Sequence, residues 1–142
     1  MTEPPGPGPV PADLMDSLAQ TSFTVIALLS RTAAGHDLSL TQLRMLAILR
    51  DRTPAMAELA AFLGLERSSV SGLIDRAERR GLVRRTASSD DGRAVQVSLT
   101  PEGHRLASQA TGEFAELIAP MTRALSRAEQ KRLTLLLGKM LE

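Results

Sequence analysis

Hydrophobic residues recur at helical spacing along most of the chain. A first helix is predicted over residues 13–34, because its apolar positions follow a 3.6-residue rhythm and Gly35 ends it. Ser39 and Gln42 form a capping box that starts a second helix, which runs to about Arg50. Its expected buried stripe consists of Leu40, Leu43, Leu46 and Ala47.

Two further helices follow with hardly any connection between them. Thr53-Pro54 supplies an N-cap with proline at the first helical position of a third helix, which Gly64 ends. Its predicted buried residues are Met56, Leu59, Ala60 and Leu63. On the fourth helix, a rotation of about 100° per residue separates an apolar side from a polar side. The apolar group is Val70, Leu73, Ile74 and Ala77, and the outward group is Ser68, Gly72, Asp75, Arg76 and Arg79.

Two short runs after the fourth helix have the pattern of β-strands. Residues 95–99 alternate apolar and polar side chains, which is typical of a strand with one buried face. Residues 82–86 are the expected partner strand, and Asp91-Gly92 is the turn signal between them. Two helices joined by a tight glycine-containing turn and followed by a hairpin indicate a winged helix-turn-helix. This fold presses one helix into the major groove of DNA.

Two more helices complete the pattern. Thr100-Pro101 starts one of them, and it continues until Pro120 disturbs it. Ser126 and Glu129 form another capping box, which opens a final leucine-rich helix. The predicted fold class is therefore mainly α (α+β), with four helices, two strands and two helices in that order.

The chain divides into four predicted segments. Residues 1–12 are a disordered Pro/Gly-rich tail, with a partner-binding arm as the alternative. Residues 13–38 are an N-terminal dimerisation helix and linker, residues 39–100 the winged helix-turn-helix, and residues 101–142 the C-terminal dimerisation helices. The terminal helices are apolar without a large domain to cover them, so we expect them to meet a second subunit. Packing against each other within a monomer is the alternative.

Charge is concentrated where the fold predicts a DNA contact. The whole chain of 142 residues has a formal net charge of only +1. Between Arg67 and Arg93, however, seven arginines and four acidic residues give a local excess of +3. Aromatic residues make up only 2% of the chain, so the core must be built from aliphatic side chains and methionine.

The residue inventory excludes several function classes. With no cysteine, no tyrosine and two separated histidines, the sequence lacks a disulfide framework, a metal cluster and a recognisable catalytic set. We therefore predict no cofactor, no metal and no enzymatic activity. Neither a signal peptide nor a membrane-spanning run is recognisable, which predicts a cytoplasmic protein without a membrane partner.

The outward face of the fourth helix carries hydroxyls near its start and guanidiniums near its end. The first residues of a recognition helix reach base edges, and later basic side chains reach phosphates. Gly72 lies at the centre of this face. It either allows a close approach to the groove or merely lacks a base-reading side chain. For the arginines, the alternative is a solvated helix face with pairs such as Asp75–Arg79.

The hairpin supplies a second candidate contact. Arg93 beside its tip suits insertion into a narrow minor groove, where the negative potential is enhanced. Asp91 is expected to brace the Arg93 guanidinium.

These residues resemble the MarR family (multiple antibiotic resistance regulators). The resemblance rests on LAAFLGLERSSVSGLIDRAERRGLVRR, the Asp-Gly-Arg of the wing and the following Ser-Leu-Thr-Pro-Glu-Gly, and covers about residues 13–141. It implies a homodimer with interleaved terminal helices that binds a pseudo-palindromic operator in double-stranded DNA and represses transcription. It also implies release by a small anionic or phenolic ligand bound between the dimerisation helices and the DNA-binding lobe.

The resemblance assigns roles to individual residues. Ser68, Ser69 and Ser71 take base-facing positions, and Arg76 takes a backbone or brace position. Gly72 stands where members commonly carry arginine, and Ala77 where they carry a larger aliphatic residue. The predicted DNA-binding set is Arg67, Ser68, Ser69, Ser71, Gly72, Arg76, Arg79, Arg84, Asp91 and Arg93.

Two residues near the junction of the first and second helices are candidate ligand contacts. They are His36 and Arg44, with an exposed loop histidine as the alternative for His36. The alternative function for the whole chain is a winged-helix architectural or protein-interaction module without an effector ligand.

Overall fold

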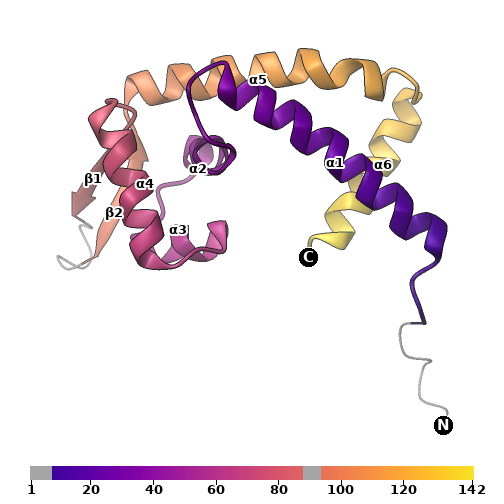
Figure 1. The fold of residues 1–142 in the computed structure, drawn as a ribbon, viewed down its shortest axis with the longest axis horizontal. Helices are drawn as coiled ribbons and strands as arrows, with labels where there is room; N and C mark the ends of the chain where they lie inside the picture. Colours follow the sequence, from indigo (N-terminus) through magenta and orange to yellow (C-terminus); the bar gives the residue numbers. More distant parts are fainter. Residues whose placement is uncertain (1–7, 88–93) are drawn as a thin grey trace, which may run out of the picture.

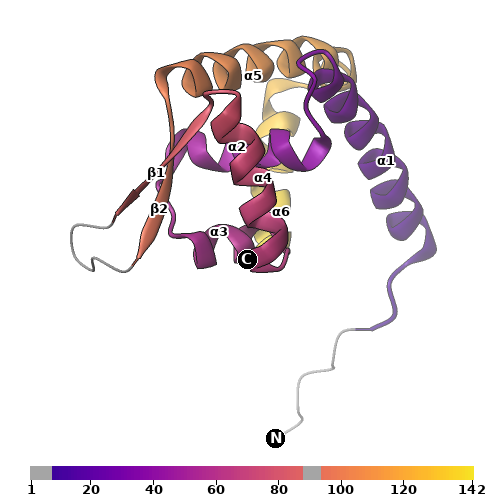
Figure 2. The same ribbon diagram turned by 60° about the vertical axis from the view of Figure 1, so that its left-hand side comes forward.

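The computed structural model describes residues 8–87 and 94–142 and confirms the predicted order of elements (Figure 1). The elements are α1 (Ala12–Ala34), α2 (Leu40–Asp51), α3 (Met56–Leu63), α4 (Arg67–Arg79), β1 (Val83–Ala87), β2 (Val95–Leu99), α5 (Pro101–Thr122) and α6 (Arg127–Met140). The elements from α2 to β2 gather into a winged lobe. The long α5 runs from that lobe to α6, as Figures 1 and 2 both show.

Side chains next to the helix starts cap three of the helices as predicted. The Ser39 hydroxyl accepts from the Gln42 N–H at 3.1 Å, and the Gln42 side chain accepts from the Ser39 N–H at 3.0 Å. Ser126 and Glu129 repeat this box at the start of α6. At α5 the Thr100 hydroxyl accepts from the Gly103 N–H. Each cap satisfies backbone donors that would otherwise have no partner.

The predicted start of α3 is wrong. The helix begins at Met56 with Ala55 as N-cap, and the Glu58 carboxylate accepts the Ala55 N–H at 3.2 Å. The Pro54 carbonyl instead accepts the N–H of Val97 at 2.9 Å, and Ala55 pairs with Gln96 of β2. These residues are therefore extended along the wing, and extended backbone cannot be the first turn of a helix.

Two further expectations are corrected. Ala47 is exposed, whereas Met45 and Leu49 of the same helix are buried. The reason is that α2 contacts α1, α3, α5 and β2 and so buries more than one narrow stripe. Pro120 does not end α5, which continues to Thr122, because proline close to a helix end removes a single hydrogen bond.

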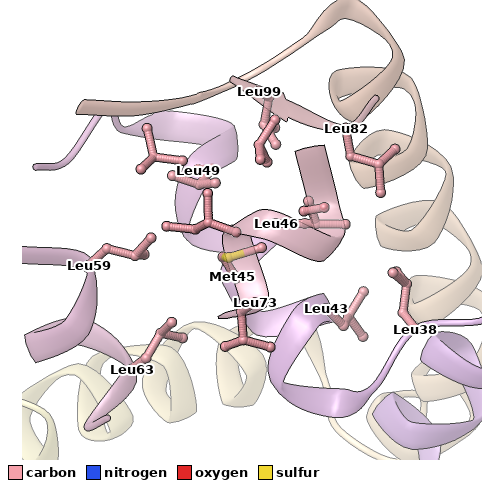
Figure 3. Packing of buried hydrophobic residues seen from close by; sticks show 14 of the residues in the cluster. Leu38, Leu43, Met45, Leu46, Leu49, Leu59, Leu63, Leu73, Leu82 and Leu99 are labelled. Atoms are coloured by element: carbon pink, nitrogen blue, oxygen red, sulfur yellow. The ribbon is translucent and has the colours of Figure 1, made fainter. Parts of the chain in front are cut away.

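The hydrophobic core surrounds α2 in the winged lobe and is completed by Ala33 of α1 and by Ala107 and Ala110 of α5 (Figure 3). Met45 and Leu46 from α2 and Leu59 from α3 are among its fully buried members. Buried aliphatic side chains of this size contribute about 1.5–3 kcal/mol each. No aromatic residue belongs to this core within the described part of the chain, as the composition required. The other large, fully buried side chains are Val70, Ile74 and Val97.

The wing is an antiparallel pair of strands that grows directly out of this core. Val83 pairs with Leu99 and Arg85 pairs with Val97. Val97 and Leu99 are buried, while Val95, nearer the tip, is 38% exposed. The predicted apolar face therefore exists at the base of the wing and not along its whole length.

Helices α1 and α6 are largely uncovered. No residue of α6 is buried, and only Thr32 and Ala33 of the 23-residue α1 are buried. In these two helices, the large apolar side chains with more than two fifths of their surface exposed are Leu14, Met15, Phe23, Ile26, Leu133, Leu135, Leu136, Leu137 and Met140. Across the described residues, no helix combines the length and the apolar character that crossing a membrane requires.

Candidate nucleic-acid interface

A tight turn sets α4 against the rest of the lobe. Gly64 adopts a left-handed conformation with φ of 66°, and the Leu65 N–H donates to the Ala60 carbonyl at 3.0 Å. This turn ends α3 and lets α4 begin at Arg67. The predicted buried face of α4 is confirmed, since Val70, Leu73, Ile74 and Ala77 are all buried.

The start of α4 presents small polar residues. Ser68 and Ser69 are exposed, and Ser71 and Gly72 are half-buried. A hollow of about 480 Å³ lies between this face and the start of α2. Its lining includes Ser39, Thr41, Leu65, Ser68, Ser69, Gly72 and Arg76.

Gly72 has no intramolecular reason to be glycine. A Cβ placed there would meet only the Arg76 Nη1 atom, at 3.7 Å, which is an ordinary van der Waals contact. Glycine in a helix interior costs about 0.5–1 kcal/mol relative to alanine. The free protein thus gains nothing from this glycine, which favours a role in close approach.

Four arginines extend from the lobe into solvent. Arg67, Arg76 and Arg79 of α4 and Arg84 of β1 are exposed. Among the described residues, none of the four forms an ion pair. Exposed positive charge at these positions favours an anionic partner.

The Asp75–Arg79 pair, which was the alternative interpretation of the arginines, does not form. Asp75 instead pairs with Arg85 of β1, whose Nη2 donates to the Asp75 carboxylate at 2.8 Å. The Nη1 of Arg85 donates to the Glu78 carboxylate. The strand pairing brings Arg85 against α4, so a tertiary contact replaces the local i,i+4 pair.

Arg80 also has an internal role. Its guanidinium donates to the carbonyls of His36 at 3.0 Å and Asp37 at 3.1 Å. The end of α4 is thereby tied to the corner between α1 and α2. Sequence reasoning missed the partners of Arg80 and Arg85. The acidic pair Asp75 and Glu78, three residues apart on one helix side, was the available signal for Arg85.

The two candidate ligand residues both have intramolecular partners. His36 Nε2 lies 2.7 Å from the Glu113 carboxylate of α5, so His36 is not an exposed loop histidine. Arg44 donates to the Phe62 carbonyl at 2.9 Å and thus links α2 to α3.

Within the described ranges, no group of three or more acidic, histidine or cysteine side chains could hold a metal ion. Asp91 and Arg93, the predicted wing-tip pair, lie outside the described residues.

Comparison with known proteins identifies the family. A model described as MarR family matches residues 36–94. The homoprotocatechuate degradative operon repressor of Escherichia coli is 32% identical over 127 residues, which span 82% of this chain and 85% of that protein. The chain belongs to the MarR family. Another relative, the transcriptional regulator PecS of Dickeya dadantii, is of the helix-turn-helix type and is 27% identical over 133 residues.

Solved MarR-family structures share the fold. NadR in complex with 4-hydroxyphenylacetate superposes with a TM-score of 0.78 at 24% identity, covering 97% of both chains. A mutant of MarR from E. coli, complexed with operator DNA, superposes with a TM-score of 0.73 at 24% identity, covering 92% of this chain and 95% of that one. The chain therefore shares the winged helix-turn-helix fold, with its flanking helices, with these structures.

Proposed function

We propose that this MarR-family regulator is a sequence-specific repressor that binds a pseudo-palindromic operator as a homodimer. The observation that carries the proposal is the outward face of α4. It joins exposed hydroxyls at the helix start to exposed arginines at its end, on a helix whose other side is anchored in the core. The likeness in fold to the MarR mutant solved with operator DNA supports DNA binding. The predicted DNA-binding residues, Asp91 and Arg93 included, are part of the proposal.

The homodimer is supported by the uncovered terminal helices. Leu18, Val25 and Ile26 of α1 and Leu137 of α6 line an almost wholly apolar hollow between the two helices. A monomer would leave this hollow in water at a free-energy cost of about 25 cal/mol per Å² of apolar surface.

Dimer geometry sets the operator. Two recognition helices entering successive major grooves on one face of the duplex require half-sites about 10 base pairs apart. In this proposal residues 13–38 and 101–142 join the subunits, and residues 39–100 contact DNA. The protein acts in the cytoplasm, without membrane attachment and without enzymatic activity.

Release by a small anionic or phenolic ligand completes the proposal. The E. coli relative is a repressor of a homoprotocatechuate operon, and NadR was solved with 4-hydroxyphenylacetate. In this chain His36 joins the corner between α1 and α2 to Glu113 of α5, and Arg80 joins that corner to α4. A ligand that displaces the His36 contact would move the end of the recognition helix. The ligand weakens DNA binding only if it binds more tightly to the state in which the His36 contact is displaced. Arg44 remains the second candidate ligand residue.

Selection of bound fragments from random DNA by the full-length protein tests the function. We expect a palindrome with half-sites about 10 base pairs apart, and a footprint on both half-sites. Sequence-independent affinity that disappears with salt would overturn the proposal in favour of an architectural module. Titration with 4-hydroxyphenylacetate, in the wild type and in H36A and R44A, tests the effector site. Unchanged release in both variants would remove these residues from it.

A further inference from the structure

The wing and the recognition helix are joined by one guanidinium. Arg85 lies on β1 opposite Val97, and its two terminal nitrogens bind different carboxylates of α4. Asp75 and Glu78 are three residues apart, so both lie on the side of α4 that faces the wing. The three side chains are only partly exposed, at 30% for Arg85, 46% for Asp75 and 35% for Glu78. Two charge-assisted hydrogen bonds from one rigid, planar group fix direction as well as distance.

Without Arg85, the two carboxylates would act against DNA binding. Asp75 precedes Arg76 and is four residues from Ser71, so it lies close to the predicted DNA face. An unpaired carboxylate there repels phosphate, and in partly desolvated surroundings the repulsion is stronger than in bulk water. Arg85 cancels much of this negative charge. The positive charge of Arg85 is thereby neutralised within the protein, whereas its neighbour Arg84 is exposed.

We propose that Arg85 is a positioning residue, an inference that rests on the proposed operator binding. It contacts no DNA. It holds the wing at one angle to α4 and neutralises Asp75 and Glu78, so that α4 and the wing meet the operator together. Arg84, the next residue on the same strand, contacts phosphate directly and is the matched control.

The two roles predict different behaviour in equilibrium binding to operator and to random duplex at several salt concentrations. The variant R85Q loses about tenfold in operator affinity while the salt dependence does not weaken. The double variant D75N/E78Q removes the two carboxylates that bind Arg85. It therefore also loses operator affinity, although its net charge is more positive than that of the wild type. The variant R84Q weakens both DNAs alike, and its salt slope falls by about 0.9. The variant R85K keeps the charge but cannot bridge both carboxylates, so it behaves like R85Q.

Opposite outcomes would overturn the role. If R85Q lowers the salt slope as R84Q does, Arg85 contacts DNA directly, and if D75N/E78Q binds the operator as well as the wild type or better, Arg85 is not a positioning residue. Amide hydrogen exchange of the free protein tests the link between the wing and α4 without DNA. Exchange in β1 and β2 accelerates in R85Q and in D75N/E78Q but not in R84Q. If the wild-type protein selects no DNA sequence, the proposed function is wrong. The exchange rates of β1 and β2 in these variants would still show whether Arg85 holds the wing.

Discussion

A Cβ atom on Gly103 would lie 2.0 Å from the carbonyl oxygen of Leu82. This carbonyl already accepts the Thr100 N–H at 3.0 Å, and the Thr100 hydroxyl donates to the Gly81 carbonyl. The start of α5 and the corner between α4 and β1 therefore touch backbone to backbone. This contact sets where the wing leaves the lobe.

Replacement of Gly103 by alanine is expected to destabilise the protein by roughly 2 kcal/mol or more, because backbone on both sides must shift. Urea unfolding followed by circular dichroism measures the change. Gly112 on the same helix is the matched control, since nothing lies within 4 Å of a Cβ placed there. Its replacement by alanine should raise the stability by about 0.5–1 kcal/mol. Equal effects at the two positions would contradict the close-contact argument.

Replacement of Gly72 by alanine separates the two interpretations of this residue. The Cβ has room in the free protein, so the stability should rise by about 0.5–1 kcal/mol. Operator affinity should nevertheless fall, because the methyl group occupies the space that the DNA backbone needs. Unfolding and binding measured on the same preparation distinguish the effects. Unchanged affinity would mean that Gly72 merely lacks a base-reading side chain.

Replacement of Leu137 by glutamate should dissociate the proposed dimer, because it places a charge in the apolar hollow between α1 and α6. Light scattering coupled to size exclusion measures the mass. The control is Gln20→Glu, which introduces the same charge about 200° around α1 from Leu18 and should leave the dimer intact. A wild type of monomer mass at micromolar concentration would refute the dimer itself.

The cap of α6 should respond to pH. Hydrogen bonds from the backbone N–H and from the hydroxyl of Ser126 hold the pKa of Glu129 below its ordinary value. A group whose pKa is lowered by folding stabilises the structure above its unfolded pKa and loses this effect as the pH falls through the folded one. The start of α6 should therefore fray in acid, which amide exchange at residues 126–130 detects. In Glu129→Gln the cap persists without the pH dependence, since glutamine also accepts the Ser126 N–H.

Replacement of Arg76 or Arg79 by glutamine should weaken binding to all DNA sequences. It should also reduce the salt slope by about 0.9 for each phosphate that the side chain neutralises in the wild type. Fluorescence anisotropy at several salt concentrations measures both quantities. Lys139→Gln removes an equal charge from α6, outside the winged lobe, and should leave the slope unchanged. An equal reduction of the slope in this control would show that the effect is one of net charge alone.

Local sequence signals were sufficient for the element order, three of the helix caps and the buried face of α4. Ser39 with Gln42, and Thr100 with Gly103, interact within one helical turn, so neighbours in the sequence are also the physical partners. The 3.6-residue and two-residue periods report burial in the same local way. The family resemblance, carried by contiguous residues, could be read for the same reason.

The tertiary structure decided what depends on distant partners. Pro54 looks like a helix start in the sequence, but its carbonyl accepts a hydrogen bond from Val97 of β2, more than forty residues away. In the sequence Arg85 is only one of seven arginines in a locally basic stretch, and the strand pairing turns it onto Asp75 and Glu78. His36 looks like an exposed loop residue until α5 brings Glu113 against it. In each case a hydrogen bond or ion pair formed across the fold outweighs the local preference, because a polar group taken out of water must find its partner wherever the packing places one.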